Sequence, residues 1–206
     1  MHPYSTATWS DALDRLAIAG VARDLVWRSG TSRLAGRVVT VLEQAGPFGS
    51  EPPAAFDVGA ILGAAQQGEV LVIDAGGAEV STFGGLAARA AAARRIEGAL
   101  VDGACRDIDE IRAAGFRICS RHVTPTTGRG RIRVAGINVP VTCGGVRVSP
   151  GDFVVADETG VVFVPAARLA EARAIVEELD GRDRAFARAI DRGGDFGVVA
   201  KNLGHT

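Results

Sequence analysis

Residues 101–110 concentrate side chains that could carry out chemistry. A short apolar run predicts a buried strand that ends at a turn, and four carboxylates, including Asp102, crowd the next nine positions together with one arginine. Arg106 could hold a carboxylate through two parallel hydrogen bonds, and Asp107 could be a ligand of a hard divalent cation. Asp107 could instead cap the helix that follows it or complement the dipole of that helix. The spacing alone leaves both interpretations open.

A glycine-rich turn precedes a helix that we expect over residues 86–95. Gly84 and Gly85 carry no side chain, so the free N–H groups at the start of this helix would be open to a carboxylate or a phosphate. These groups include the amides of Leu86 and Ala87. The glycines do not follow the spacing of a dinucleotide-binding or P-loop motif, and a plain tight turn is the simpler interpretation of this segment taken alone.

The elements that must position these groups fall into two halves. In the first half strands and helices alternate, with Ser10 as the expected cap of the first helix. The expected strands are 38–42, 70–74, 99–101 and 117–120, and the expected helices are 10–19, 56–67, 86–95 and 108–114. The second half has short strands separated by turns, at 132–134, 139–142, 146–148, 153–156 and 161–164. We therefore expect one α/β domain over residues 1–206, with a core at about 10–180, a long helix over 166–191 and a loose tail over 192–206.

Composition and charge exclude several classes of function. The chain has 206 residues, of which 23 are basic and 24 acidic, and a net charge of −1 argues against a nucleic-acid partner bound by bulk electrostatics. No apolar run reaches the roughly 18 residues of a membrane span, and the first residues lack the pattern of a signal peptide. Three cysteines do not make a disulfide framework. We therefore expect a cytoplasmic protein with no nucleic-acid or membrane partner.

The basic residues are almost all of one type. Of the 23 basic side chains, 22 are arginine, and Lys201 is the only lysine. This composition nearly excludes Schiff-base aldolases, pyridoxal-phosphate enzymes and Walker-type NTPases, since each of them needs a lysine at the reacting group.

Three further motifs have structural explanations. The spacing of Cys119 and His122 has no second pair to complete a zinc site, and the cysteines are best interpreted as small apolar residues. Residues 128–133 alternate arginine with glycine or isoleucine but lack aromatic side chains, so we expect an arginine-edged strand or a subunit interface there. Residues 157–160 lie between two apolar strands and predict a hairpin turn.

One spacing resembles the signature of a known family. Gly85, twenty intervening residues, Arg106 and Asp107, two more residues and then Glu110 resemble the G-x20-R-D-x2-E/D pattern of the RraA-like family. This family contains the regulators of ribonuclease E activity and the 4-hydroxy-4-methyl-2-oxoglutarate aldolases. Further similar stretches run in order from about residue 10 to residue 171, so the resemblance covers most of the chain.

The resemblance implies a fold, an assembly and a chemistry. The implied fold is a compact α/β/β domain that resembles the swivelling phosphohistidine domain. The implied assembly is a homotrimer, or a dimer of trimers, with sites between subunits. The aldolase branch of the family is metal-dependent and acts on small 2-oxo acids. By resemblance, Asp107 holds Mg²⁺ or Mn²⁺ mostly through water, Arg106 binds the pyruvate carboxylate and steadies the enolate, and the amides of Leu86 and Ala87 bind the same carboxylate. In the absence of a Schiff-base lysine, a metal must stabilise the enolate.

Position 85 departs from the aldolase branch, whose pattern resembles D-x20-R-D. Here glycine replaces the carboxylate that organises a proton-transferring water, and Asp102 or an acid of a partner subunit is the candidate replacement. The expected activity is therefore a lyase that releases pyruvate, either a 4-hydroxy-2-oxo acid aldolase or an oxaloacetate-type decarboxylase. A non-catalytic regulator that binds a ribonuclease assembly is the first alternative. An S-adenosylmethionine-dependent methyltransferase is the second, supported only by the strand at 70–74 followed by Gly76 and Gly77.

Overall fold

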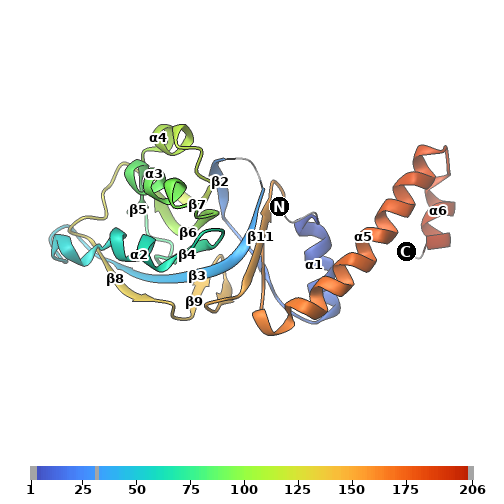
Figure 1. The fold of residues 1–206 in the computed structure, drawn as a ribbon, viewed down its shortest axis with the longest axis horizontal. Helices are drawn as coiled ribbons and strands as arrows, with labels where there is room; N and C mark the ends of the chain where they lie inside the picture. Colours follow the sequence, from blue (N-terminus) through green and yellow to red (C-terminus); the bar gives the residue numbers. More distant parts are fainter. Residues whose placement is uncertain (1–3, 31–32, 204–206) are drawn as a thin grey trace.

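The computed structural model describes residues 4–30 and 33–203. Its centre is a ten-stranded sheet with the main order β1-β12-β11-β3-β4-β6-β7-β2, and Figure 1 shows the sheet curled, with the long C-terminal helix at one end. The longest strand, β3 (Arg33–Ala45), joins the two parts of the sheet. It pairs antiparallel with β11 (Phe153–Asp157) through its first residues and parallel with β4 (Val70–Asp74) through its middle.

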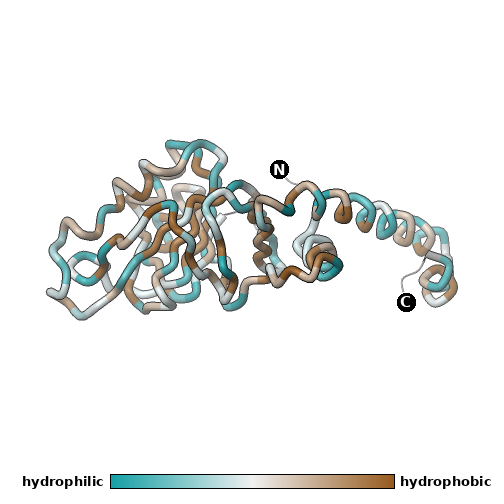
Figure 2. The backbone as a smooth tube through the Cα atoms, turned by 90° about the horizontal axis from the view of Figure 1, so that it is seen from below, coloured by the Kyte–Doolittle hydropathy of each residue, from teal (hydrophilic) through white to brown (hydrophobic). Residues whose placement is uncertain are grey.

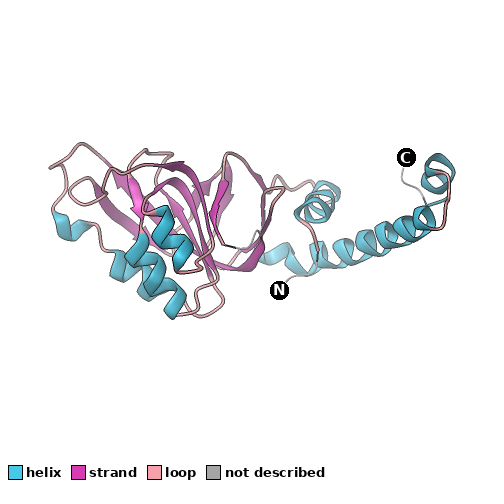
Figure 3. Cartoon of the chain, turned by 90° about the horizontal axis from the view of Figure 1, so that it is seen from above, coloured by secondary structure: helices cyan, strands magenta, loops and turns pink. Residues whose placement is uncertain are grey.

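The parallel part of the sheet carries the helices that border the site. Next to β4 lie β6 (Gly98–Cys105) and then β7 (Ile118–Val123), all in parallel pairing. Three helices, α2 (Val58–Ala64), α3 (Gly85–Ala93) and α4 (Ile108–Ala113), cover one face of these strands, as Figure 3 shows. Both faces of β4 are buried, because alternate residues face the helices and the opposite core. This explains why its residues are apolar almost without interruption.

The antiparallel part supplies the second core. It contains β8 (Ile132–Ile137), which pairs with the end of β3, and β12 (Val161–Val164), which pairs with β11. A separate hairpin of β9 (Val141–Cys143) and β10 (Val146–Val148) packs its apolar side chains against the strands. The edge strands β1 (Val21–Ala22) and β2 (Val26–Ser29) lie at opposite ends of the order although only residues 23–25 separate them. The sheet must therefore curl until its two edges come close together.

Helices α1 (Thr6–Arg15) and α5 (Leu169–Asp191) form a third core with the outer face of β11 and β12. Beyond this contact α5 projects from the domain, and Figure 2 shows hydrophilic and hydrophobic residues alternating along the projecting half. None of the helices in the described residues combines the length and the apolar composition that a bilayer crossing requires.

Two local expectations about the chain ends are wrong. The first helix begins at Thr6 with Ser5 as its N-cap, and not at Ser10, because Trp9 is completely buried and belongs to the helix that packs on α5. The tail that we expected to be loose contains helix α6 (Phe196–Leu203), whose Phe196 ring packs edge-on against Phe186 of α5 at 5.0 Å. The likeness to the swivelling phosphohistidine domain stays a prediction.

The expected hairpin turn at residues 157–160 is confirmed, and its first residue also anchors α1. Asp157 and Gly160 exchange backbone hydrogen bonds, and the Asp157 carboxylate accepts from Thr6 N at 2.8 Å and Thr6 Oγ1 at 2.6 Å. Burial by itself raises the pKa of Asp157, but the hydrogen bonds from Thr6, Thr159 and Gly160 outweigh it and lower the pKa.

Glu43 on β3 is a carboxyl group buried without a partner. Its exposed fraction is 3%, and neither carboxyl oxygen has a hydrogen-bond partner among the described residues. Burial raises the pKa of Glu43 from 4.5 to about 8, because the charged form loses its hydration. Glu43 is therefore largely protonated at neutral pH in the folded protein, whereas in the unfolded chain it ionises near its ordinary pKa.

We expect Glu43 to lower the stability of the protein as the pH rises from about 5 to about 8. Over this range the unfolded chain has released a proton that the folded protein still holds, so each pH unit lowers the free energy of unfolding by up to about 1.4 kcal/mol. The stabilisation by protonated Glu43 is complete below the pKa that this group has in the unfolded chain. It is lost as the pH rises through the pKa of Glu43 in the folded protein. Glu43→Gln removes the titration and keeps the shape, so its urea midpoint should decline less over this range than that of the wild type. The exposed Glu177→Gln is the control, and equal declines in Glu43→Gln and wild type would contradict the assignment.

Candidate functional site

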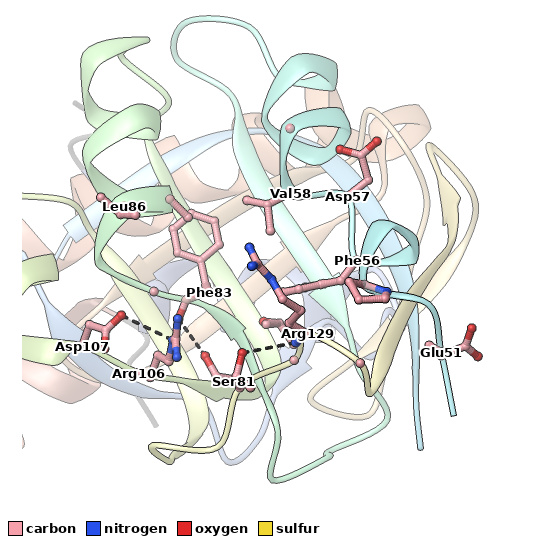
Figure 4. Close-up of a pocket in the computed structure, with 18 of the residues that line it drawn as sticks. Glu51, Phe56, Asp57, Val58, Ser81, Phe83, Leu86, Arg106, Asp107 and Arg129 are labelled. Carbon is pink, nitrogen blue, oxygen red and sulfur yellow. Dashed lines mark hydrogen bonds and ion pairs between the residues drawn. The ribbon is translucent and has the colours of Figure 1, made fainter. Parts of the chain in front are cut away.

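A cavity of about 1210 Å³ opens beside the first turn of α3. Four parts of the chain line it: the loop at 48–59, residues 81–87 with strand β5 (Ser81–Phe83), the start of α4 with the turn before it, and residues 127–130. Figure 4 shows side chains from all four parts around one space. Arg106, Asp107 and the turn of Gly84 and Gly85 all lie in this lining, so segments that are about twenty residues apart in sequence meet here.

The glycine pair allows the two sides of the cavity to approach closely. Gly84 is the N-cap of α3, and a Cβ atom there would lie 2.8 Å from Asp107 Oδ2. A Cβ atom at Gly85 would overlap the carboxylate of Glu110. Side chains at these two positions would therefore displace both acidic groups. The first-turn amides of Leu86 and Ala87 have no acceptor within the helix and face an anion-binding position at its positive end.

Arg106 and Asp107 lie side by side at the rim of this turn. Arg106 Nε is 3.4 Å from Asp107 Oδ2, and the two side chains are 42% and 37% exposed. Asp107 adopts the left-handed backbone conformation, with φ at 55°, which non-glycine residues adopt rarely and often at functional sites. Both side chains are therefore held in place and still reach the cavity.

The structure bears on both interpretations of Asp107. It is the N-cap residue of α4, but its side chain makes no capping hydrogen bond to this helix. Asp107 Oδ2 instead accepts a hydrogen bond from Gly85 N at 3.2 Å, across the cavity rim. The expected side-chain cap is therefore absent, the carboxylate still lies at the positive end of the α4 dipole, and its role as a metal ligand stays a prediction.

Glu110 is a site residue to which the sequence pattern alone assigned no role. It lies in the first turn of α4, three residues after Asp107, so both side chains fall on the same face of the helix. Its carboxylate occupies the place that a side chain at position 85 would take. Glu110, and not Asp102, is therefore the further carboxylate that lines the cavity beside Gly85.

Asp102 lies apart from this cavity. It lines a smaller cavity of about 440 Å³, is 6% exposed, and forms an ion pair with Arg121 at 2.7 Å. Its other oxygen accepts from Gly144 N at 2.7 Å, and the hydrogen bond with Asp102 raises the pKa of Arg121. Within the described chain Asp102 and Arg106 therefore line different cavities, and the Asp102 carboxylate already holds Arg121 and the β9–β10 turn. The expected role of Asp102 in proton transfer stays a prediction.

The acidic groups of the cavity fit a hydrated divalent cation. Asp107 and Glu110 flank the glycine turn, and no group of three or more His, Cys, Asp or Glu side chains in the described residues could enclose a metal ion. Mg²⁺ keeps several waters in proteins and is commonly held by one or two carboxylates. Asp107 and Glu110 are therefore the carboxylates that could hold Mg²⁺ or Mn²⁺ through water, and the metal stays a prediction.

The cysteines take no part in the site. Cys105, Cys119 and Cys143 are free and buried, and burial raises the pKa of each thiol, that of Cys119 to about 12. A thiolate is therefore unfavourable at neutral pH, which confirms the interpretation of these residues as small apolar side chains.

The loop after β7 was the least expected part of the cavity. We expected residues 128–133 to form a strand edge or a subunit interface, and β8 does begin at Ile132. Residues 127–130, however, line the cavity opposite Arg106, together with Phe48 and Phe56 from the other loop. The glycines on either side of Arg129 were the available signal, because they mark a close approach of the backbone to another segment.

Comparisons with known proteins identify the family of this chain. A family model described as "RraA-like: Aldolase/RraA" matches residues 6–163. The chain is 35% identical over 127 residues to a "Putative 4-hydroxy-4-methyl-2-oxoglutarate aldolase" of Halalkalibacterium halodurans, a match that covers 61% of this chain and 60% of the relative. It spans between 27% and 62% of the length of other curated relatives.

Two solved structures share the fold over nearly the whole chain. An uncharacterized protein from Pseudomonas syringae has a TM-score of 0.84 at 26% identity and covers 96% of this chain and 92% of its own. Streptomyces coelicolor RraAS2, described as an unusual member of the RNase ES inhibitor RraA protein family, has a TM-score of 0.79 at 27% identity over 91% of this chain and 93% of its own. Because the family model matches most of the chain and the residues of the family signature meet in one cavity, this chain belongs to the RraA-like family.

Proposed function

We propose that the chain is a divalent-metal-dependent carbon–carbon lyase that releases pyruvate from 2-oxo acids. The reaction is either the cleavage of a 4-hydroxy-2-oxo acid or the decarboxylation of oxaloacetate. The observation that carries this proposal is the convergence of the Arg106 guanidinium, the Asp107 carboxylate and the first-turn amides of α3 in one cavity. The aldolase name of the relative from Halalkalibacterium halodurans supports the same class of reaction.

The pyruvyl half of the substrate lies at the start of α3. Its carboxylate accepts hydrogen bonds from Leu86 N and Ala87 N, and Arg106 binds the same group from the side through its fork of N–H donors. Arg106 also faces the 2-oxo oxygen, where negative charge develops as the enolate forms. The ion pair with Asp107 and the hydrogen bond from Arg106 N to Phe83 O at 3.0 Å hold this arginine in position.

Mg²⁺ or Mn²⁺, when bound by Asp107 beside Glu110, supplies Lewis-acid stabilisation of the enolate. The lysine content supports this class of mechanism, since the only lysine, Lys201, is exposed on α6, in the helical pair at the far end of α5. Gly85 N and Arg106 Nε both contact Asp107 Oδ2, so Oδ1 is the oxygen that would hold the ion.

Glu110 separates the two candidate reactions. Cleavage of a 4-hydroxy-2-oxo acid needs a group that accepts the proton of the C4 hydroxyl, whereas decarboxylation of oxaloacetate does not. The Glu110 carboxylate lies where position 85 has no side chain of its own, so it is the acceptor for that proton, directly or through one water.

The second candidate is a non-catalytic regulator of a ribonuclease assembly. The likeness to RraAS2, described with the RNase ES inhibitor family, favours it. A pure interaction protein, however, has no need of a strained Asp107 beside a carboxylate-binding arginine. The methyltransferase alternative is favoured by the likeness to a structure described as an S-adenosylmethionine:2-dimethylmenaquinone methyltransferase, at 26% identity and a TM-score of 0.61. The turn of Gly76 and Gly77 that suggested it, however, is held by Asp74 and lines a cavity apart from Arg106 and Asp107.

We further propose that the chain assembles as a homotrimer or a dimer of trimers with the cavity near a subunit boundary. Two large apolar side chains at the cavity support this assembly: Leu86 is 81% exposed and Phe48 is 74% exposed. Exposed apolar groups around a cavity commonly mark a surface that another molecule covers.

The first prediction is a metal-dependent release of pyruvate. The protein incubated with oxaloacetate or with 4-hydroxy-2-oxo acids should form pyruvate in the presence of Mg²⁺ or Mn²⁺, and a chelator should abolish the reaction. Pyruvate is measured by coupling to lactate dehydrogenase. If none of these substrates gives pyruvate in a reaction that a chelator abolishes, the lyase proposal fails and the regulator is the better-supported function.

The second prediction concerns the pair at the rim of the cavity. Arg106→Ala and Asp107→Ala should each lower kcat/KM by about 100-fold or more, because Arg106 stabilises the developing enolate directly and Asp107 would hold the metal ion that stabilises it. Asp109→Ala is the matched control, since Asp109 lies on the same helix with its side chain fully exposed and forms only a surface ion pair with Arg112. Near-wild-type rates in both site variants would place the site elsewhere.

The third prediction tests Glu110. Glu110→Gln should lower aldol cleavage by at least about 100-fold, the lower end of what general-base catalysis contributes, and leave most of the oxaloacetate decarboxylation. Gly85→Asp alone should not help, because its side chain would collide with Glu110; the double variant Gly85→Asp, Glu110→Ala should recover aldol cleavage. Equal losses of both activities in Glu110→Gln would argue against a role in proton transfer.

A further inference from the structure

Arg129 lines the cavity from the other side of β5 than Arg106, because Thr127 pairs with Ser81 along one edge of this strand and Arg106 N bonds to Phe83 O along the other edge. Figure 4 shows its guanidinium pointing into the space between Phe83 and Val58. Within residues 4–30 and 33–203, no ion pair or side-chain hydrogen bond of Arg129 is formed, although its side chain lines the cavity. The two arginines that follow in the same segment differ: Arg131 stacks on the Phe48 ring at 4.8 Å, and Arg133 forms an ion pair with Glu51 at 3.4 Å.

The backbone that carries Arg129 is fixed from two sides. On one side, Ser81 N donates to Thr126 O at 2.9 Å, which ties the loop to β5. On the other side, Gly49 N donates to Gly130 O at 2.8 Å. Gly128 lies so close to β5 that a Cβ atom there would be 2.6 Å from Ser81 O. The guanidinium therefore extends from a rigid loop, although the side chain itself is free.

The nearby acidic groups already have partners. Glu51 is paired with Arg133. Asp57 accepts from Ala60 N at 2.8 Å as the cap of α2. Asp107 is engaged by Gly85 N and Arg106 on the opposite side. Apolar walls, among them Phe56 and Val58, border the same space. A guanidinium in such surroundings favours an anion supplied by the ligand, because low local polarity strengthens the attraction between opposite charges.

We propose that Arg129 determines specificity by binding a second anionic group of the substrate, at the end far from the pyruvyl carboxylate. This inference rests on the proposed lyase function and adds the residue that binds the other half of the substrate. The cavity then favours 2-oxo acids that carry a carboxylate beyond the scissile bond over those that carry a methyl group there. When the C3–C4 bond breaks, its electron pair forms the pyruvate enolate, the C4 hydroxyl gives its proton to Glu110, and the distal carboxylate leaves on the carbonyl product.

Two substrates of equal chain length test this inference by turnover. 4-Hydroxy-2-oxoglutarate and 4-hydroxy-2-oxopentanoate differ only in a terminal carboxylate or methyl group. The wild type should prefer the dicarboxylate by at least about tenfold in kcat/KM, as a charged hydrogen-bonded pair allows. Arg129→Gln should remove that preference by lowering kcat/KM for the dicarboxylate far more than for the monocarboxylate, and Arg129→Lys should keep part of it. Arg147→Gln, which removes the same charge from an exposed position on β10, should keep all of it. Equal losses with both substrates, or an unchanged preference, would overturn the inference.

A binding measurement distinguishes a failure of this inference from a failure of the lyase proposal. With Mg²⁺ present, calorimetry should show 2-oxoglutarate binding more tightly than 2-oxopentanoate to the wild type, and equal affinities in Arg129→Gln. If no substrate is cleaved but this selectivity appears and depends on Arg129, the lyase proposal fails and the second anion site stands. If pyruvate is formed but neither selectivity depends on Arg129, the lyase proposal stands and the present inference is wrong.

Discussion

The short pairing of β5 with β6 holds together the two segments on which the cavity depends. Phe83 lies beside Cys105 in this pairing, and Arg106 N donates to Phe83 O at 3.0 Å, so the first turn of α3 lies against the turn before α4. The approach is so close that side chains at positions 84 and 85 would overlap Asp107 and Glu110. It also gives Asp107 a partner across the cavity, Gly85 N, and this contact offsets the strain of a left-handed backbone. Glycine here is a requirement of packing between segments, and the acidic groups reach the rim because of it.

The arginines fall into two groups. Some are paired with a buried or half-buried carboxylate of the chain, and others have a charge that remains available to a ligand. Arg121 is held by Asp102, and Arg117 by Glu97 at 2.8 Å, so these two stabilise the sheet and its edges. Arg106 shares its charge with one partly exposed carboxylate, and Arg129 has no such partner among the described residues. Two guanidinium groups therefore face one cavity from opposite sides. In a chain with a single lysine on a distant helix, recognition of anions falls to arginine, whose planar fork matches a carboxylate.

Local patterns predicted most of the fold because most of its elements are stabilised by their own sequence. The strand at 70–74 has the bounds expected for it, because a run of apolar residues suits a strand buried on both faces. So does the one at 146–148, where two buried valines alternate with the exposed Arg147. The elements that were missed are short and depend on partners. Strands β1 and β5 have two and three residues and exist only through pairing with β12 and β6. Helix α6 forms against α5 through Phe186 and Phe196, and no local pattern marks that contact.

The sequence by itself determined the family, the alternation of strands and helices, and the residues of the signature, because motif spacing and periodicity are properties of neighbouring positions. It also argued against Schiff-base chemistry, since the sequence contains a single lysine, Lys201. Only the tertiary structure decided which acids face the cavity. Asp102 is nearer to Arg106 in sequence than Gly85 is, yet alternation along β6 turns its side chain to Arg121, whereas Glu110 reaches position 85 from the next helix. The same holds for Arg129, which a loop from beyond β7 carries to the opposite wall. Distances between side chains of different segments depend on how strands pair and helices pack, and these long-range contacts are absent from any local pattern.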